Sequence, residues 1–179
     1  MSWYKKAAQF WGKSGSGMLY VCLEDQTMLL VLRSNEVEDP GTWGIPGGAI
    51  VGTEGMHDSS EGENFDIETS RYSAELEAEE ELGCRPQPIK ELGTTNYRFG
   101  NFNYVTFVVA VSSKEKKRLQ TCISLNWEND KWDWFPINRP PAGLHFGVEH
   151  TVTEHQLFQP QAEPTTKQDF TPTDENNQP

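Results

Sequence analysis

The chain has 179 residues, which suits one domain with some length left over, and its charge and composition argue against nucleic-acid backbones and membranes as partners. Fifteen basic residues against 27 acidic ones give a net charge of -12, and such a surface repels the phosphate backbone of nucleic acids. No run of about 18 apolar residues is present, so no membrane span is expected. Hydrophobic residues make up only 35% of the chain, which indicates a polar, flexible part beside a folded core.

The N-terminus and the cysteines together predict a cytoplasmic protein. Residues 1–6 lack the apolar stretch of a signal peptide. The three cysteines form no CxxC pair and no disulfide framework, so reduced thiols are the simplest interpretation of Cys22, Cys84 and Cys122. The sequence does not determine the oligomeric state, and a homodimer is compatible with it.

By composition the chain divides into three parts. Residues 1–16 are expected to be a flexible lead-in, 17–158 a folded domain and 159–179 a disordered polar tail. Strand-like and helix-like segments follow one another within the domain, which predicts an α+β or α/β fold with a mixed sheet. In chain order, the expected strands are 18–23, 28–32, 89–92, 103–111 and 132–137, and the expected helices are 67–82 and 148–158.

The segment 67–82 has the clearest helical pattern in the chain. Asp66 is the expected N-cap, and Gly83 is the expected stop at the C-terminal end. Small and apolar residues recur at i, i+4 and i+8, which places one stripe of the helix against a core: Ala74, Ala78 and Leu82.

This helix also carries a cluster of acidic side chains. Five of the seven residues from Glu75 to Glu81 are glutamate, and the i, i+3, i+4 spacing puts Glu77, Glu80 and Glu81 on one face. Each exposed pair of like charges on a helix costs about 0.2–0.5 kcal/mol, and more in a partly buried cleft. Mg²⁺ or Mn²⁺ suits such a carboxylate cluster. A solvated acidic face that meets a basic partner is the simpler alternative.

A Pro-Gly-Gly bend upstream of the helix favours the metal-site interpretation. Pro46 fixes the direction of the chain, while Gly47 and Gly48 permit a close approach to a ligand or metal. A turn there could leave the carbonyl of Gly48 available to a cation. Glu54 follows six residues later, ahead of the polar segment 55–66, which is expected to be an inserted surface loop.

At these residues the sequence resembles the Nudix hydrolase (MutT-like) family, whose pattern is G-x5-E-x7-R-E-U-x-E-E-x-G-U, with U a bulky aliphatic residue. Gly48 and Glu54 match G-x5-E, and residues 77–83 match E-U-x-E-E-x-G. The preceding Trp-Gly-Ile-Pro-Gly-Gly is similar to the family's usual approach to this motif, and the resemblance covers roughly residues 17–158.

Two features depart from the family pattern. Leu76 stands where the family has an arginine that supports a motif glutamate, and Arg71, about one turn away, is a candidate substitute. The insertion also separates Glu54 from the helix. Gly62 and Glu68 would fit the spacing without an insertion, but only Gly48 and Glu54 follow a Pro-Gly bend, so that pair is preferred.

The resemblance implies an α/β/α sandwich and a hydrolase that cleaves the pyrophosphate bond of a nucleoside diphosphate linked to another moiety. It implies Mg²⁺ or Mn²⁺ as cofactor, with Glu77, Glu80 and Glu81 as ligands, the Gly48 carbonyl completing the set, and Glu54 in support. Such cations neutralise pyrophosphate charge and lower the pKa of bound water, and they explain how an acidic protein could hold a small polyanionic nucleotide.

Residues outside the motif supply further candidates. Glu128 is the candidate general base, with a surface loop acid as the alternative. Arg33 ends a strand and could contact a substrate phosphate, or it could face solvent at an edge. Tyr97 and Phe99 belong to an aromatic cluster that could stack on a base or pack in a hairpin.

Two rival functions are also consistent with the sequence. Leu76 and the insertion are consistent with a catalytically impaired nucleotide-binding or regulatory module on the same fold. An acidic interaction protein without any cation dependence is the third interpretation. The sequence does not identify the nucleotide.

Overall fold

The computed structural model describes residues 14–50, 66–99 and 102–155, and all structural statements refer to these ranges. Glu54, most of the expected loop at 55–66 and the expected tail at 159–179 lie outside them. The elements in chain order are β1 (Ser14–Cys22), β2 (Thr27–Arg33), β3 (Trp43–Gly44), β4 (Gly47–Ala49), α2 (Ile67–Leu82), β5 (Lys90–Phe99), β6 (Phe102–Val111), α3 (Ser113–Cys122), β7 (Asn129–Pro136) and α4 (Phe146–Glu154).

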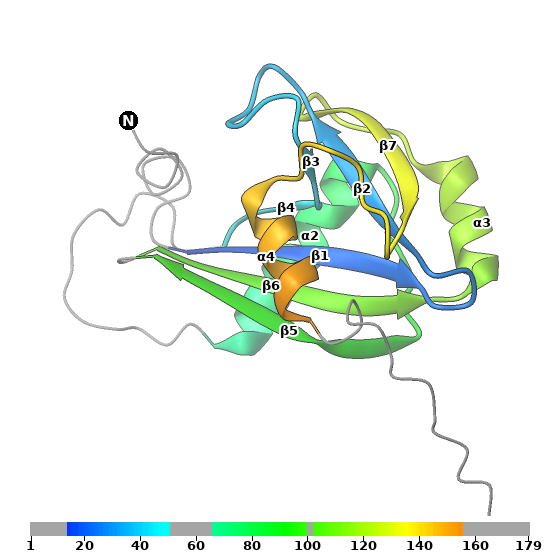
Figure 1. Cartoon of the computed structure of the whole chain (residues 1–179), viewed down its shortest axis with the longest axis horizontal. Coiled ribbons are helices and arrows are strands. Elements are labelled where there is room, and N and C mark those ends of the chain that lie inside the picture. Colours follow the sequence, from blue (N-terminus) through cyan, green and yellow to red (C-terminus); the bar gives the residue numbers. More distant parts are fainter. Residues whose placement is uncertain (1–13, 51–65, 100–101, 156–179) are drawn as a thin grey trace, which may run out of the picture.

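The strands form one mixed seven-stranded sheet, with the order β3-β2-β1-β6-β5, β4 paired to β1 and β7 paired to β2. β1 and β6 run parallel, whereas the other paired strands are antiparallel. One core cluster joins the sheet to α2 and α3, and a second joins the opposite face to α4. Figure 1 shows α4 in front of β1 and β6, with α2 behind them. The predicted α/β/α sandwich is therefore confirmed. None of the described helices combines the length and the apolar character needed to cross a membrane.

The first strand begins earlier than its sequence pattern indicates. β1 starts at Ser14, so residues 14–16 belong to the sheet and are not part of a lead-in. This Ser-Gly-Ser segment lacks the branched and aromatic residues typical of strands. Its pairing with β6 on one side and β4 on the other forms the strand, and both contacts are distant in sequence.

The predicted helix at 67–82 is confirmed as α2, with the expected ends. The side chain of Asp66 accepts a hydrogen bond from the backbone of Glu68 at 3.4 Å, and Gly83 adopts a left-handed conformation (φ 65°) that suits glycine. The predicted core stripe is fully buried: Ala74, Ala78 and Leu82. This packing fixes the face on which the glutamates lie.

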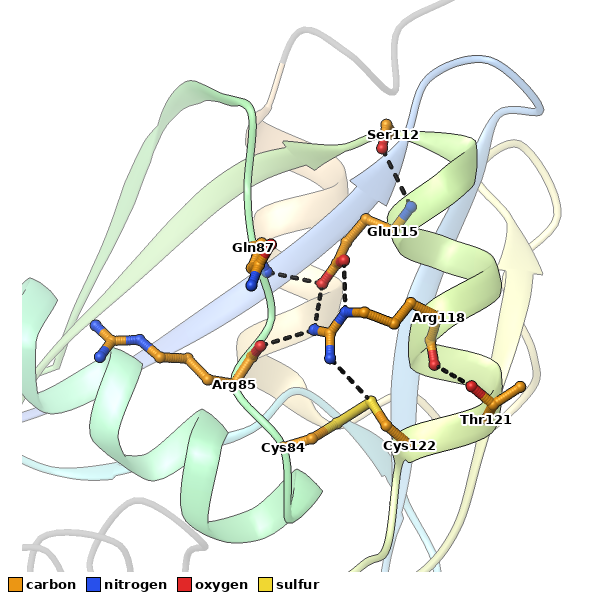
Figure 2. Close-up of polar contacts among 8 residues, drawn as sticks. All are labelled: Cys84, Arg85, Gln87, Ser112, Glu115, Arg118, Thr121 and Cys122. Carbon is orange, nitrogen blue, oxygen red and sulfur yellow. Dashed lines mark hydrogen bonds and ion pairs between the residues drawn. A yellow bond between two sulfur atoms is a disulfide. The ribbon is translucent and has the colours of Figure 1, made fainter.

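Helix α3 was not predicted, because its sequence has little apolar periodicity. Leu119 is its only fully buried apolar residue, and most of the other side chains are charged or polar. Ser112 caps the helix by accepting a hydrogen bond from the Glu115 backbone at 3.1 Å. Figure 2 shows Arg118 bridging from Glu115 to the carbonyl of Arg85. The Arg118 guanidinium holds the pKa of the Glu115 carboxyl below its usual range. Capping and tertiary contacts therefore stabilise a helix that its pattern does not reveal.

The expectation of three reduced thiols is wrong for two of the cysteines. Cys84 and Cys122, 38 residues apart in sequence, form a disulfide across a Cα–Cα distance of 6.2 Å (Figure 2), while Cys22 is a buried free thiol. The turn at Gly83 directs the end of α2 towards the end of α3, which sequence spacing does not show. Disulfides are rare in cytosolic proteins, so one of the two reasons for expecting a cytoplasmic location is lost.

A buried histidine at the start of α4 gives this fold a specific acid sensitivity. His145 caps α4, and burial, reinforced by the nearby Arg33 guanidinium, lowers its pKa from 6.5 to about 3. The carboxylate of Asp39 lies 3.7 Å away but is 38% exposed, and it does not offset the burial. Because the unfolded chain binds a proton at this position below pH 6.5 and the folded chain does not, stability falls as the pH drops below 6.5.

We therefore expect that His145→Asn, which keeps a good N-cap, reduces the acid sensitivity. Between pH 7 and pH 5 the wild-type chain should lose about 2 kcal/mol more of its free energy of unfolding than the variant. Urea denaturation at the two pH values measures this difference. An identical pH dependence in both proteins would show that His145 does not titrate as described.

Candidate active site

Glu81 is the most constrained glutamate of α2. Its side chain is buried, with the residue 4% exposed, and each carboxylate oxygen accepts one hydrogen bond. The backbone N–H of Gly47 donates to Oε1 at 2.7 Å, and the Asn129 amide donates to Oε2 at 2.6 Å. Burial, reinforced by the carboxylates of Glu128 and Glu77, raises the pKa of Glu81 to about 8 against the lowering effect of these two donors. Negative charge at this position is therefore incompletely compensated.

The bend at Pro46–Gly48 lies directly against two of the predicted metal ligands. Gly47 contacts Glu81 through its N–H, and a Cβ placed on Gly48 would lie 2.6 Å from the carboxyl carbon of Glu77. A side chain at position 48 would therefore displace the carboxylate of Glu77. The structure thus brings together Gly48, Glu77 and Glu81, as the sequence predicts.

The other glutamates between Glu75 and Glu80 are more exposed than Glu81. Glu80 and Glu79 are exposed, and Glu75 is half-buried. Glu75 pairs with Arg85 at 3.1 Å and with Arg71 at 3.9 Å. Glu80 shares the helix face of Glu77 and Glu81, but its carboxylate must turn inward to join them.

The segment before β7 brings Glu128 to the same place. The backbone N–H of Asn126 donates to the Glu81 carbonyl at 3.1 Å, and the Asn126 side chain bonds to both the backbone and the carboxylate of Glu128. The Glu128 carbonyl accepts a hydrogen bond from Ser34 at 2.8 Å. Sequence reasoning selected Glu128 from this segment but missed Asn126 and Asn129, for which the short polar run Asn-Trp-Glu-Asn-Asp was the only available signal.

The residues predicted to contact the substrate lie in different parts of the fold. Arg33 pairs in the sheet with Asn129, which brings it next to the site, and its guanidinium donates to the Glu38 carbonyl at 2.7 Å. Tyr97 lies on the α4 side of the sheet, where its ring packs 5.4 Å from Phe146 and 5.2 Å from His150 (centroid distances). The backbone of Phe99 pairs with that of Phe102 at the β5–β6 hairpin, and its side chain lies outside the described part of the chain.

At the position where the family pattern has an arginine, this chain has an uncharged side chain. Leu76 is 39% exposed on α2. Arg71, the candidate substitute, pairs with Glu91 and Glu75 and covers the ring of Phe107 at 4.6 Å. Within the described residues, Glu81 is therefore held by neutral donors, and the guanidinium of Arg71 is engaged with other partners.

The oxygen atoms around Glu81 are of the kind that bind a hydrated hard cation, although they are not arranged as a complete metal site. Within the described residues, no three His, Cys, Asp or Glu side chains are close enough to hold a metal ion as they stand. The hydroxyl of Ser16 is fully buried and has no hydrogen-bond partner there. Ser16 is opposite Gly48 in the antiparallel pair, so its side chain shares the face that meets Glu77. Carboxylate, carbonyl and hydroxyl oxygens are the donors that Mg²⁺ and Mn²⁺ prefer.

Comparisons with known proteins agree with this fold. The MutT protein from Methanosarcina mazei Go1 is 16% identical, with a TM-score of 0.52, over 78% of this chain and 89% of that one. The MutT NUDIX hydrolase from Burkholderia pseudomallei is 19% identical (TM-score 0.46; 78% and 95% covered). The NUDIX domain of Shewanella oneidensis NrtR, solved with ADP ribose, is 21% identical (TM-score 0.46; 86% and 98% covered). A search of curated sequences finds no match. The sequence profile described as the NUDIX domain matches residues 13–154, and the chain therefore belongs to the NUDIX family.

Proposed function

We propose that this protein is a divalent-cation-dependent hydrolase that cleaves the pyrophosphate bond of a nucleoside diphosphate linked to another moiety. The observation that carries the proposal is the position of Glu81, buried between Gly47 and Asn129 and within electrostatic reach of Glu77 and Glu128. A buried carboxylate with two other carboxylates nearby needs positive charge, and neutral amides supply only hydrogen bonds. Membership of the NUDIX family supports the same reaction class.

Each of these residues has a defined part in the proposed reaction. Glu77, Glu80, Glu81 and the Gly48 carbonyl would hold Mg²⁺ or Mn²⁺. When bound, the cations neutralise pyrophosphate charge and make bound water more acidic. Glu128, whose side chain is held by Asn126, would accept a proton from water at its carboxylate oxygen.

The substrate would meet residues around this cluster. Arg33, paired with Asn129, would contact a phosphate, and its charge would partly offset the net charge of -12 that opposes polyanion binding. Tyr97 and Phe99 stay as predicted base contacts, and Glu54 as a predicted supporting residue. Because the ring of Tyr97 packs against α4, a purely structural role is the main alternative to a base contact for this residue.

A panel of nucleotides incubated with Mg²⁺ or Mn²⁺, with product identity as the readout, tests the proposal. We expect cleavage within a pyrophosphate linkage, giving two phosphorylated products, and no cleavage when EDTA removes the cations. The rival, a nucleotide-binding module without catalysis, is favoured by Leu76 at the arginine position. Saturable binding of a nucleotide without any product would support that rival and contradict the hydrolase.

A further inference from the structure

The side chain of Asn129 holds the buried carboxylate of Glu81 from the opposite side to the Pro46–Gly48 bend. Asn129 is 6% exposed, and its amide nitrogen lies 2.6 Å from Oε2 of Glu81, while the Gly47 N–H occupies Oε1. Two donors on different oxygens fix the plane of the carboxylate. Each oxygen also keeps a second lone pair, so a hydrogen-bonded carboxylate can still bind a cation.

An irregularity in the sheet places Asn129 on the face of α2. Leu32 of β2 pairs with Lys131, but the next residue, Arg33, pairs with Asn129, so Asp130 is an extra residue in β7. In an unbroken strand, alternation would put Asn129 on the face opposite Trp132 and Trp134. The extra residue reverses this alternation, and Asn129 lies on the same side as those two tryptophans, which pack in the core cluster of α2.

The backbone next to Asn129 is anchored to the end of α2. The N–H groups of Ser124 and Asn126 donate to the carbonyls of Leu82 and Glu81 at 2.9 Å and 3.1 Å. These bonds fix the distance between the helix end and the start of β7. The Asn129 amide therefore meets Glu81 at a position set by the backbone.

From this geometry we propose that Asn129 is a positioning residue, which holds Glu81 in the orientation that binds the divalent cation. The inference rests on the proposed function and assigns to a neutral amide the support that the family pattern places on an arginine, here Leu76. An amide orients the carboxylate without placing beside it a positive charge that would compete with the cation. In this chain, Asn129 orients the carboxylate and Glu81 binds the cation.

Replacing Asn129 tests the proposal through Mn²⁺ affinity, measured by isothermal titration calorimetry without substrate. Asn129→Leu removes the donor at similar size, and Asn129→Ala serves in its place if the leucine variant does not fold. We expect the Kd for Mn²⁺ to rise about 10- to 100-fold, as for other residues that orient metal ligands. Asn129→Gln keeps an amide donor and should recover most of the affinity. Asn96→Leu, at an exposed position of β5, should bind like the wild type.

Urea denaturation and turnover separate positioning from simple stabilisation. A positioning role predicts a lower kcat with little change in KM and a weaker Mn²⁺ affinity in a folded variant. A folded Asn129→Leu protein that binds Mn²⁺ as tightly as the wild type would overturn the role of Asn129, whatever its stability. A wild-type chain that binds no Mn²⁺ would overturn the proposed function, and the role of Asn129 with it.

Discussion

Replacing Glu81 with glutamine is expected to lower kcat for nucleotide hydrolysis by about 1000-fold, the upper range for losing one group that stabilises the transition state. Glutamine has nearly the same shape, so its carbonyl oxygen can still accept the hydrogen bond from Gly47. It carries no charge, however, and cannot balance a divalent cation. Steady-state kinetics at saturating Mg²⁺ or Mn²⁺ measure the change.

The matched control for this variant is Glu79→Gln on the same helix. Glu79 is exposed, and its nearest ion-pair partner is Arg85 at 4.0 Å. We expect its kcat to stay within about twofold of the wild type, because exposed ion pairs contribute little. If Glu81→Gln kept wild-type turnover, or if both variants lost activity equally, Glu81 would have no special place in the reaction.

The second large effect is expected at Gly48. A methyl group there would lie 2.6 Å from the carboxyl carbon of Glu77, so the carboxylate at the end of this side chain must move aside. Because only the end of a side chain has to move, we expect a loss of no more than about 1 kcal/mol in the free energy of unfolding, the lower end of the range for overpacking. A displacement of about 1 Å at a reacting group costs about 100-fold in rate. We therefore expect Gly48→Ala to lose about 100-fold in kcat/KM.

Gly44→Ala is the control, because it makes the same change in the neighbouring strand β3. A Cβ at Gly44 would meet Arg33 no closer than 3.5 Å, an ordinary contact, so we expect near wild-type stability and turnover. Thermal unfolding and kcat/KM of the two variants give the comparison. Equal activity of Gly48→Ala and the wild type would show that the contact between Gly48 and Glu77 does not matter to the site.

Local patterns predicted the helix that carries the site but not everything that surrounds it. α2 begins at Ile67 and ends at Leu82 as predicted, because a cap, an apolar stripe and a terminal glycine act within a few residues of one another. The start of β1 at Ser14, the helix α3 and the disulfide were not predicted. Each depends on partners that are distant in sequence, and none of the three has a strong local pattern.

The candidate site shows the same division. Helical spacing was enough to group Glu77 with Glu81, and the Pro-Gly bend indicated Gly48 as their neighbour. Asn129 is 48 residues from Glu81, and a strand irregularity brings it there, so no sequence period could identify it. Ser16 lies in a Ser-Gly-Ser segment whose composition is typical of a linker, so the sequence did not indicate a place for it in the site. Residue type and spacing thus indicated the proposed metal ligands, whereas they did not indicate the residues that only the fold brings beside them.

Anomalous diffraction from crystals of the wild-type chain grown with Mn²⁺ tests the central claim most directly. We expect a manganese peak between Glu77 and Glu81, beside the bend at Pro46–Gly48, with Asn129 still bonded to Glu81. A peak elsewhere on the molecule, or none at a Mn²⁺ concentration that supports turnover, would contradict it.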